Sequence, residues 1–207
     1  MLGSKQKLAV LLSKLKVFER PNLSLEQYST DSEIAATIIW DAHMHNEIGN
    51  QRIADFGCGT GILGIGALAL GAKHVTFIEL DHTVFPLLME NLKKLEEELH
   101  TEFSNYEIIQ GNIEHYNQPV DMVLQNPPFG TQEKHSDMLF LKKALSLATK
   151  VYSLHKTSTE EYLRAWAQTN GIRVTNQYHF QFPLKQTMAQ HQKKVQYIDV
   201  SCLKFES

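Results

Sequence analysis

The feature that most constrains the fold is an alternation of short strand-like runs with helical segments between residues 52 and 169. The strand-like runs are rich in β-branched and aromatic residues and lie near 52–56, 74–79, 106–110, 121–125 and 151–155. Helical segments are expected near 61–70, 83–100, 137–149 and 159–169. Because a helical crossover returns the chain to the same end of the sheet, such strands run parallel. The alternation therefore predicts an α/β fold with helices on both faces of a mostly parallel sheet.

The two ends of the chain depart from this alternation. Beyond Gly171 the runs 172–182 and 195–205 alternate in strand fashion, which predicts a C-terminal antiparallel hairpin and a seven-stranded sheet. Near the N-terminus a second helix is expected over 31–47, after a first one marked by helically spaced leucines, namely Leu8, Leu11, Leu12 and Leu15. The 207 residues fit a single domain. We divide it into an N-terminal helical cover (1–50), an α/β core (51–170) and the C-terminal hairpin (171–207).

Cysteine content, apolar runs and charge exclude several classes of protein. Cys58 and Cys202 are the only cysteines, which predicts neither a disulfide framework nor a thiolate zinc site and favours a reducing location in the nucleus or cytoplasm. His43 and His45 are two positions apart on an expected helix and point to different sides, so no metal site is expected. The longest apolar stretch, 62–72, is shorter than the roughly 20 residues that cross a bilayer, so no membrane association is expected. The net charge of −3 indicates that any nucleic-acid contact is local or shared with a partner.

A glycine-rich loop follows the first predicted strand, at the edge of an α/β sheet where ligands bind. Asp55 ends the strand, and the loop continues with Gly57, Cys58, Gly59, Thr60 and Gly61. With Gly64 this loop also satisfies the fingerprint of dinucleotide-binding proteins, and Glu79 at the end of the second strand could hold ribose hydroxyls in either case. The Asp55 carboxylate disfavours a pyrophosphate but is compatible with the sulfonium and ammonium groups of S-adenosylmethionine. An ordinary tight turn is the alternative explanation of the glycines.

The tetrapeptide Asn126-Pro127-Pro128-Phe129 follows the fourth predicted strand, at the same edge of the sheet. The exocyclic amine of adenine is a weak nucleophile because its lone pair is delocalised into the ring. The Asn126 side-chain oxygen and the Pro127 carbonyl could each accept one amine hydrogen and so localise the lone pair. The two prolines restrict the backbone, and Phe129 offers an aromatic face to an extruded base. A proline turn with an aromatic plug is the structural alternative.

With both motifs present, the chain resembles the methyltransferase-like protein 5 family over nearly its whole length. The matching segments are 25–28, 55–61, 126–131 and 152–156. The resemblance implies a Rossmann-like class I methyltransferase fold and N6-methylation of an adenosine in small-subunit ribosomal RNA, with S-adenosylmethionine as the cofactor. It also implies a heterodimer with a small zinc-binding activator protein, for which an exposed sheet edge is one plausible docking surface.

The resemblance also assigns site residues. The catalytic loop would consist of Asn126, Pro127, Pro128 and Phe129. The cofactor would be held by Gln27, Tyr28, Thr30, Asp55, Gly57, Cys58, Gly59, Thr60, Gly61, Glu79, Asn112 and Asn126. The chain departs from the family pattern at Ser29, where proline is favoured, and at Asn112, where an acidic residue is favoured.

Contacts with RNA are less sharply indicated. His155 and Lys156 end the fifth predicted strand on the ligand side, and further basic residues accompany the hairpin connection, namely Lys185, His191, Lys193 and Lys194. Both groups could equally be solvent-exposed surface. Ser153 and His155 share a strand face, but no orienting acid is evident, so a hydrolytic triad is not predicted.

Two other functions remain as alternatives at this point. A protein-glutamine methyltransferase could hold its side-chain amide in the same loop, although that family generally has tyrosine at the position of Phe129. A nucleotide-binding scaffold without catalysis is the second alternative, and the presence of Asp55 and Asn126 speaks against it.

Overall fold

The structure is a computed structural model that describes residues 2–18, 22, 26–129, 136–185 and 195–207. Its strands are β1 (Arg52–Phe56), β2 (His74–Glu79), β3 (Tyr106–Gln110), β4 (Met122–Gln125), β5 (Lys150–Lys156), β6 (Arg173–Lys185) and β7 (Val195–Glu206). Its α-helices are α1 (Lys5–Ser13), α2 (Ser32–Met44), α3 (Ile62–Ala69), α4 (Phe85–Leu99), α5 (Ser136–Leu147) and α6 (Glu160–Thr169). Short 3-10 turns are η2 (His82–Val84), η3 (Ile113–His115) and η4 (Thr157–Thr159).

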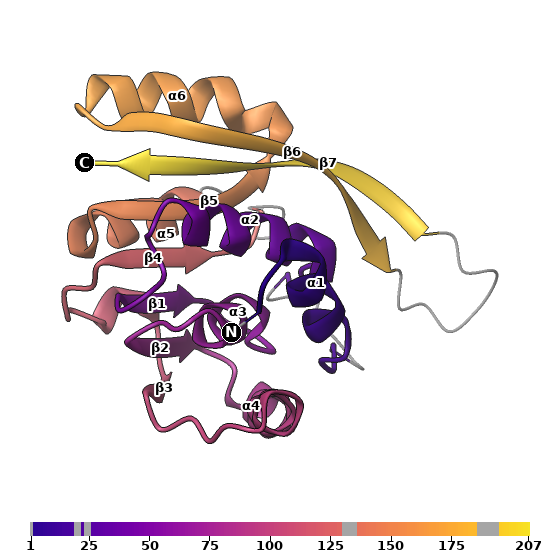
Figure 1. Cartoon of the computed structure of the whole chain (residues 1–207). Helices are drawn as coiled ribbons and strands as arrows, with labels where there is room; N and C mark the ends of the chain where they lie inside the picture. Colours follow the sequence, from indigo (N-terminus) through magenta and orange to yellow (C-terminus); the bar gives the residue numbers. More distant parts are fainter. Residues whose placement is uncertain (1, 19–21, 23–25, 130–135, 186–194) are drawn as a thin grey trace.

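The described strands form one seven-stranded sheet in the order β3-β2-β1-β4-β5-β7-β6 (Figure 1). The strands β1 to β5 pair in parallel, whereas β7 lies antiparallel between β5 and β6. The order reverses between β1 and β4, which is the point of an open α/β sheet where a ligand crevice forms. The predicted fold class is therefore confirmed.

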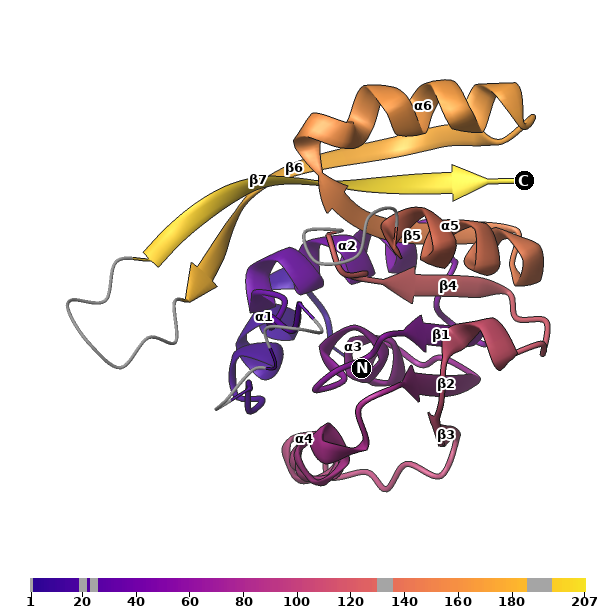
Figure 2. The same ribbon diagram turned by 180° about the vertical axis from the view of Figure 1, so that it is seen from behind.

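Helices cover both faces of the sheet (Figures 1 and 2). The side chains of α1, α2, α3 and α4 contribute to the larger hydrophobic core on one face. Those of α5 and α6 contribute to a second core on the other face. The N-terminal helices thus pack into the same core as the α/β unit. Among the described helices, none is long and apolar enough to cross a membrane.

The predicted elements match the observed ones, with differences at their ends. The helix α2 begins after Asp31, whose carboxylate accepts hydrogen bonds from the amides of Glu33 and Ile34, as expected of an N-cap. It ends at Met44, earlier than predicted, because the backbone turns at Asn46, where φ is 60°. The hairpin strands are longer than predicted, and both extend beyond the rest of the sheet (Figure 1).

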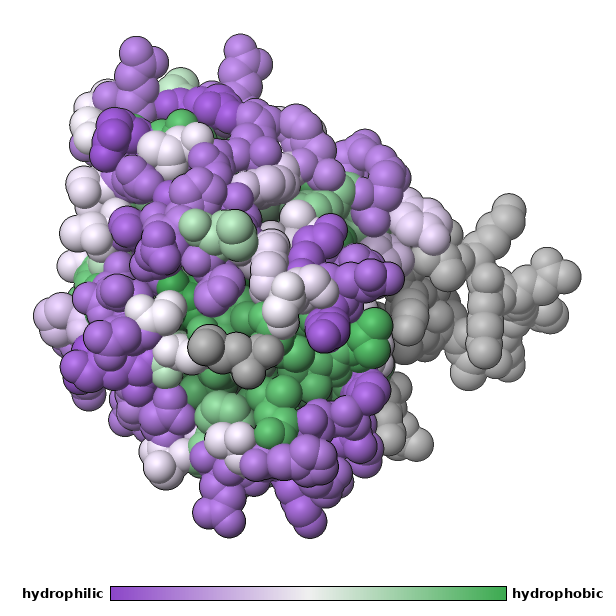
Figure 3. All heavy atoms as spheres, in the orientation of Figure 1, coloured by the Kyte–Doolittle hydropathy of each residue, from purple (hydrophilic) through white to green (hydrophobic). Residues whose placement is uncertain are grey.

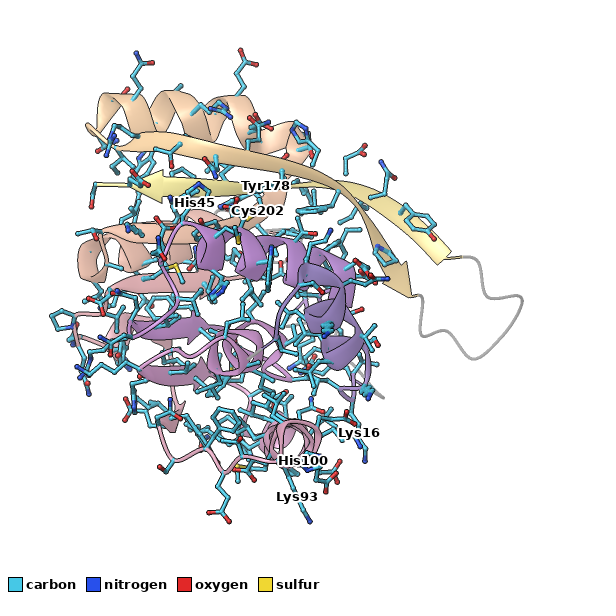
Figure 4. The ribbon with its side chains drawn as sticks, viewed as in Figure 1. Lys16, His45, Lys93, His100, Tyr178 and Cys202 are labelled. Atoms are coloured by element: carbon cyan, nitrogen blue, oxygen red, sulfur yellow. The ribbon has the colours of Figure 1, made fainter. Side chains whose placement is uncertain are left out.

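Buried polar contacts anchor the hairpin to the body of the protein. Lys204 of β7 lies 2.8 Å from Glu47, and both side chains are 5% exposed. The Tyr152 hydroxyl of β5 donates to the same Glu47 carboxylate at 2.9 Å. Tyr178 of β6 and Cys202 of β7 are paired across the hairpin beside the end of α2 (Figure 4). The two contacts with Glu47 join segments that lie more than a hundred residues apart in the sequence.

The face shown in Figure 3 is mainly hydrophilic, with an apolar area over the region of α1 and α3. The apolar side chains there belong to helices whose inner sides form the larger core. The cavity considered below is lined by the loops that follow the strands, together with the segment after α1.

Candidate active site

A cavity of about 320 Å³ lies where the ends of β1, β2 and β4 meet the N-terminal segment. Its volume falls at the lower end of the range of about 300–1,000 Å³ that is usual for small-molecule sites. The predicted cofactor residues that line it are Gln27, Tyr28, Thr30, Asp55, Gly57, Cys58, Gly59, Thr60, Glu79, Asn112 and Asn126. The glycine loop and the loop that bears Asn126 therefore share one cavity. The role of each residue stays a prediction.

The glycine loop turns the chain from β1 into α3. Gly61 precedes the helix with φ of 87°, a left-handed conformation that favours glycine. A Cβ atom at Gly61 would lie 2.2 Å from a Leu88 methyl carbon, so packing as well as backbone conformation excludes a larger residue. Gly61 does not itself line the cavity. We therefore attribute to it a conformational role, which shapes the loop around its neighbours.

Asp55 is a buried carboxylate in the cavity wall, and its side chain accepts a hydrogen bond from the Gly64 amide at 2.8 Å. Burial raises the pKa of Asp55 to about 7; the Gly64 hydrogen bond lowers it in part and the charge of Glu79 raises it. The Glu79 carboxylate accepts from the amides of Gly59 and Asp81, both at 2.9 Å, and burial raises its pKa. Two buried carboxyl groups with raised pKa values in one cavity favour a cationic ligand, because a positive charge offsets the desolvation of their ionised forms.

Hydrogen bonds from α4 hold the segment that follows α1 against the glycine loop. The Asn91 amide nitrogen of α4 donates to the carbonyls of Thr60 at 2.9 Å and Lys16 at 3.0 Å, while its oxygen accepts from the Lys16 amide at 2.7 Å. Lys16 lies beside α4 (Figure 4). The Gln27 amide donates to Asp81 at 2.8 Å. Asn91 was not identified from the sequence, because an asparagine inside an amphipathic helix carries no local signal of such a role.

Of the two polar side-chain atoms of Asn126, one is hydrogen-bonded and the other has no partner among the described residues. Its amide nitrogen donates to the Thr30 hydroxyl at 3.0 Å, whereas its oxygen is buried and has no partner within the described residues. A buried acceptor without a partner is energetically costly, and such atoms are often completed by a ligand. Asn126 and Pro128 line the cavity, while Pro127 is buried and does not. The geometry fits the predicted acceptance of an amine hydrogen by Asn126.

Phe129 does not present the open aromatic face that we expected for base stacking. It is 8% exposed and stacks on Tyr28 with ring centroids 4.9 Å apart. The ring of Phe182 from β6 meets both in edge contacts. The Phe129 amide donates to the Tyr28 hydroxyl at 3.1 Å, and burial raises the pKa of Tyr28 above its ordinary value. In this structure Phe129 therefore anchors the loop between the N-terminal segment and the hairpin.

The expected RNA contact at His155 is wrong. Its side chain is 0% exposed and bonded to Ser153 and to Asp137, so it cannot reach a polynucleotide. Asp137 is also the orienting acid that we did not identify, since it lies 18 residues before His155 in the sequence, on a different element. Lys156 is partly exposed. The side chain of Lys185, and residues His191, Lys193 and Lys194, lie outside the described part of the structure.

Several residues of the cavity wall were missed. They are mainly apolar, and those outside the predicted set include Phe18, Ile62, Leu63, Leu80, Ile113, Leu139 and Phe140. Single apolar residues at element ends look like core residues in sequence, so no local signal marks them. Asn112 caps η3 by accepting from the Glu114 amide at 3.0 Å and donates to the Glu114 carboxylate at 3.1 Å. Glu114 thus brings an acidic group to the wall beside the position where the family pattern favours one.

Comparison with known proteins connects this site to a family. The model for Conserved hypothetical protein 95 matches residues 38–182. The rRNA N6-adenosine methyltransferase METTL5 of Danio rerio is 32% identical, over 94% of this chain and 94% of its own length. Its Drosophila melanogaster counterpart is 34% identical, over 97% and 95%. The chain belongs to the methyltransferase-like protein 5 family. A proposed RNA methyltransferase of Pyrococcus horikoshii, whose crystal structure is known, is 35% identical and has a TM-score of 0.88, covering 100% of this chain and 98% of its own.

Membership of the methyltransferase-like protein 5 family confirms the resemblance seen in the sequence. An uncharacterized protein of Methanocaldococcus jannaschii is also 34% identical, over 98% of this chain and 94% of its own length. Because these relatives match 94–98% of the chain, the similarity includes the N-terminal cover and the hairpin as well as the α/β core.

Proposed function

We propose that this chain is an rRNA adenine-N6 methyltransferase that uses S-adenosylmethionine and modifies an adenosine of the small ribosomal subunit. The relatives from Danio rerio and Drosophila melanogaster carry the names of rRNA N6-adenosine methyltransferases. The observation that carries the proposal is the buried, unpartnered Asn126 oxygen in the same cavity as the Asp55 carboxylate, both among the residues that the structure describes. The Asn126 oxygen can accept a hydrogen bond from an amine, and the Asp55 carboxylate suits a cation.

The residues of the cavity fit the cofactor. S-adenosylmethionine, when bound, supplies a methyl group activated by a sulfonium. The glycine loop provides a wall without side chains, where a nucleoside can approach the main chain closely. Asp55 and Glu79 are both buried acids in the wall, and they suit the cationic and hydroxyl groups of such a ligand. NAD fits less well, because its pyrophosphate would lie beside the Asp55 carboxylate.

The loop from Asn126 to Phe129 would hold the adenine amine. The free Asn126 oxygen accepts one hydrogen of the amine. We propose that the Pro127 carbonyl accepts the other, although Pro127 is buried and lies outside the cavity lining. Both contacts draw the lone pair out of conjugation and orient it. Thr30 prevents the Asn126 amide from rotating by accepting from its nitrogen. The prolines and the Tyr28–Phe129 stack keep the loop in place before substrate arrives, so little entropy is lost on binding.

Partner and location follow from the same proposal. The net charge of −3 is unfavourable for unaided RNA binding, so we expect a protein partner that contributes RNA contacts or stability. The family resemblance implies that this partner is a small zinc-binding activator. Lys156, Lys185, Lys193 and Lys194 are the basic residues of this chain that we propose for RNA contact. Ribosomal RNA as the substrate places the activity in the nucleus or the cytoplasm.

The test is transfer of an isotope-labelled methyl group to total RNA, followed by nucleoside identification and mapping. We expect label in N6-methyladenosine of small-subunit rRNA. Asn126→Ala should lower the rate about 100-fold or more, because the amine loses an oriented acceptor. Binding of S-adenosylhomocysteine should still be measurable, because Asn126 is only one of the residues predicted to hold the cofactor. Asn117→Ala, at an exposed asparagine, is the matched control and should leave the rate unchanged.

Two results would contradict the proposal. Undiminished transfer by Asn126→Ala would remove the catalytic role of the loop. Label in protein glutamine, with none in RNA, would favour a protein methyltransferase. For the cofactor, thermal stabilisation by NAD but not by S-adenosylhomocysteine would replace methyl transfer with redox chemistry.

A further inference from the structure

Beneath the proposed catalytic loop, buried polar side chains form a continuous row of hydrogen bonds. The Gln125 amide nitrogen donates to the Ser153 hydroxyl at 2.8 Å. Ser153 Oγ lies 2.7 Å from His155 Nε2, and His155 Nδ1 lies 3.2 Å from an Asp137 oxygen. Ser153 and His155 are 0% exposed and Gln125 is 1% exposed, while the Asp137 side chain is 15% exposed. We call these four residues the buried relay.

All the hydrogen bonds of the buried relay are donated in the same direction, from Gln125 toward Asp137. An ionised Asp137 only accepts, so His155 Nδ1 carries the proton that is donated to it. In the tautomer with its proton on Nδ1, His155 accepts at Nε2 from the Ser153 hydroxyl, and Ser153 accepts from Gln125. Burial acts to raise the pKa of Asp137, but the hydrogen bonds from His155 and from the Met138 amide outweigh it, so the pKa lies below its ordinary value.

The ends of the buried relay bracket the catalytic loop. Gln125 is the last residue of β4 and immediately precedes Asn126, whereas Asp137 is in the first turn of α5. The link between them passes through β5, which pairs with β4 so that Gln125 is opposite Ser153. The Ser136 hydroxyl next to Asp137 donates to the carbonyl of Pro128 at 3.3 Å. The relay therefore connects the residue before the loop with the helix turn that holds the loop from its other side.

Ser153, His155 and Asp137 are connected in the same way as the residues of a hydrolytic triad, but they do not act as one. A nucleophile must meet its substrate, and Ser153 is fully buried beneath the loop. Neither Ser153 nor His155 lines the cavity. What the relay can do is fix the position of the loop, since breaking any link leaves a buried polar atom without a partner.

We propose that His155 and Asp137 are positioning residues for methyl transfer: the buried relay aligns Asn126 and Pro127 with the amine, without touching substrate or cofactor. The proposal rests on the function proposed above. Since a displacement of about 1 Å in a reacting group can lower a rate about 100-fold, loss of the relay should act mainly on kcat. The cofactor wall at Asp55, Glu79 and Gly59 is made by other strands, so cofactor affinity should be retained.

The test compares His155→Asn with His155→Gln in the full-length chain. Asparagine places its amide where Nδ1 lies and can still donate to Asp137, but it loses the bond to Ser153; glutamine reaches toward Ser153 and loses the bond to Asp137. Because each variant breaks one link of the buried relay, we expect kcat on rRNA to fall about tenfold or more below wild type in both. KM for S-adenosylmethionine and affinity for S-adenosylhomocysteine should stay within about twofold of wild type in both. A kcat equal to that of wild type in both variants would overturn the proposal.

Other results of these experiments would also decide between the proposal and its alternatives. A fall in kcat accompanied by an equal loss of cofactor affinity and of thermal stability would indicate general damage and would also overturn it. If the His155 variants do not fold, Asp137→Asn, which keeps an acceptor for His155, is compared with Asp137→Ala, which does not, and kcat is expected to be about tenfold or more lower for Asp137→Ala. Absence of transfer to rRNA by the wild-type chain with its activator would instead refute the proposed function, so the two failures are distinguishable.

Discussion

Replacing Asp55 with asparagine should change how the stability of this protein depends on pH. The Asp55 side chain is 1% exposed, and its pKa is raised from 3.8 to about 7 by burial. Between these two values the folded state binds a proton that the unfolded state does not, so the free energy of unfolding falls as pH rises. The loss is complete once pH passes the folded-state pKa. The asparagine of the variant cannot ionise, and it keeps an oxygen that can accept from the Gly64 amide.

The size of the effect follows from the two pKa values. With about 1.4 kcal/mol for each pKa unit, the stability lost through Asp55 is about 1.7 kcal/mol at pH 5 and about 4 kcal/mol at pH 8. The free energy of unfolding of Asp55→Asn, minus that of wild type, should therefore increase by about 2–3 kcal/mol between pH 5 and pH 8. The subtraction removes the contributions of carboxylates such as Glu206, whose lowered pKa acts in the opposite direction at lower pH.

Urea unfolding of the ligand-free protein at several pH values measures this difference directly. Asp121→Asn, which removes a negative charge at an exposed position, is the control for the change in net charge. Binding of a cationic cofactor should in addition release close to one proton near pH 6, because the cation favours ionised Asp55. Calorimetry in two buffers of different ionisation enthalpy detects that proton. A stability difference that does not vary with pH by more than about 0.5 kcal/mol would refute the reasoning.

Two further predictions concern stability. Gly61→Ala should lower the free energy of unfolding by about 2–4 kcal/mol, since it combines φ of 87° with a contact of 2.2 Å to Leu88. Gly71→Ala has the same φ but open space around it, so chemical unfolding should show a loss of only about 1 kcal/mol; equal losses would refute the steric argument. Lys204→Met removes the closer of two cations paired with the buried Glu47 carboxylate, and because Lys150 remains at 3.1 Å, the change should cost about 2–3 kcal/mol. In a double-mutant cycle with Glu47→Gln the two losses should be strongly non-additive, and simple additivity would contradict the pairing.

The sequence alone predicted the strands and the α-helices, whose positions depend on neighbours along the chain. Strand and helix positions follow from periodicity, and the turn at Gly61 follows from the backbone freedom of glycine. The two functional loops were placed at one edge of the sheet because parallel strands align their carboxyl ends. The family could also be identified, since the motifs around Asp55 and Asn126 are local. These inferences share a physical basis: each rests on preferences of the backbone or of a few adjacent side chains.

Only the tertiary structure determined which of these side chains are buried and which neighbours they contact. His155 ends its strand at the predicted edge, yet Asp137 from α5 binds it, and the surrounding elements bury it. Phe129 lies in the predicted loop, but Tyr28, about a hundred residues away in sequence, covers its face. The Asn126 oxygen remains free, among the described residues, only because Thr30 holds the amide nitrogen. Burial and hydrogen-bond partners depend on packing between distant segments, and local residue preferences carry no information about that packing.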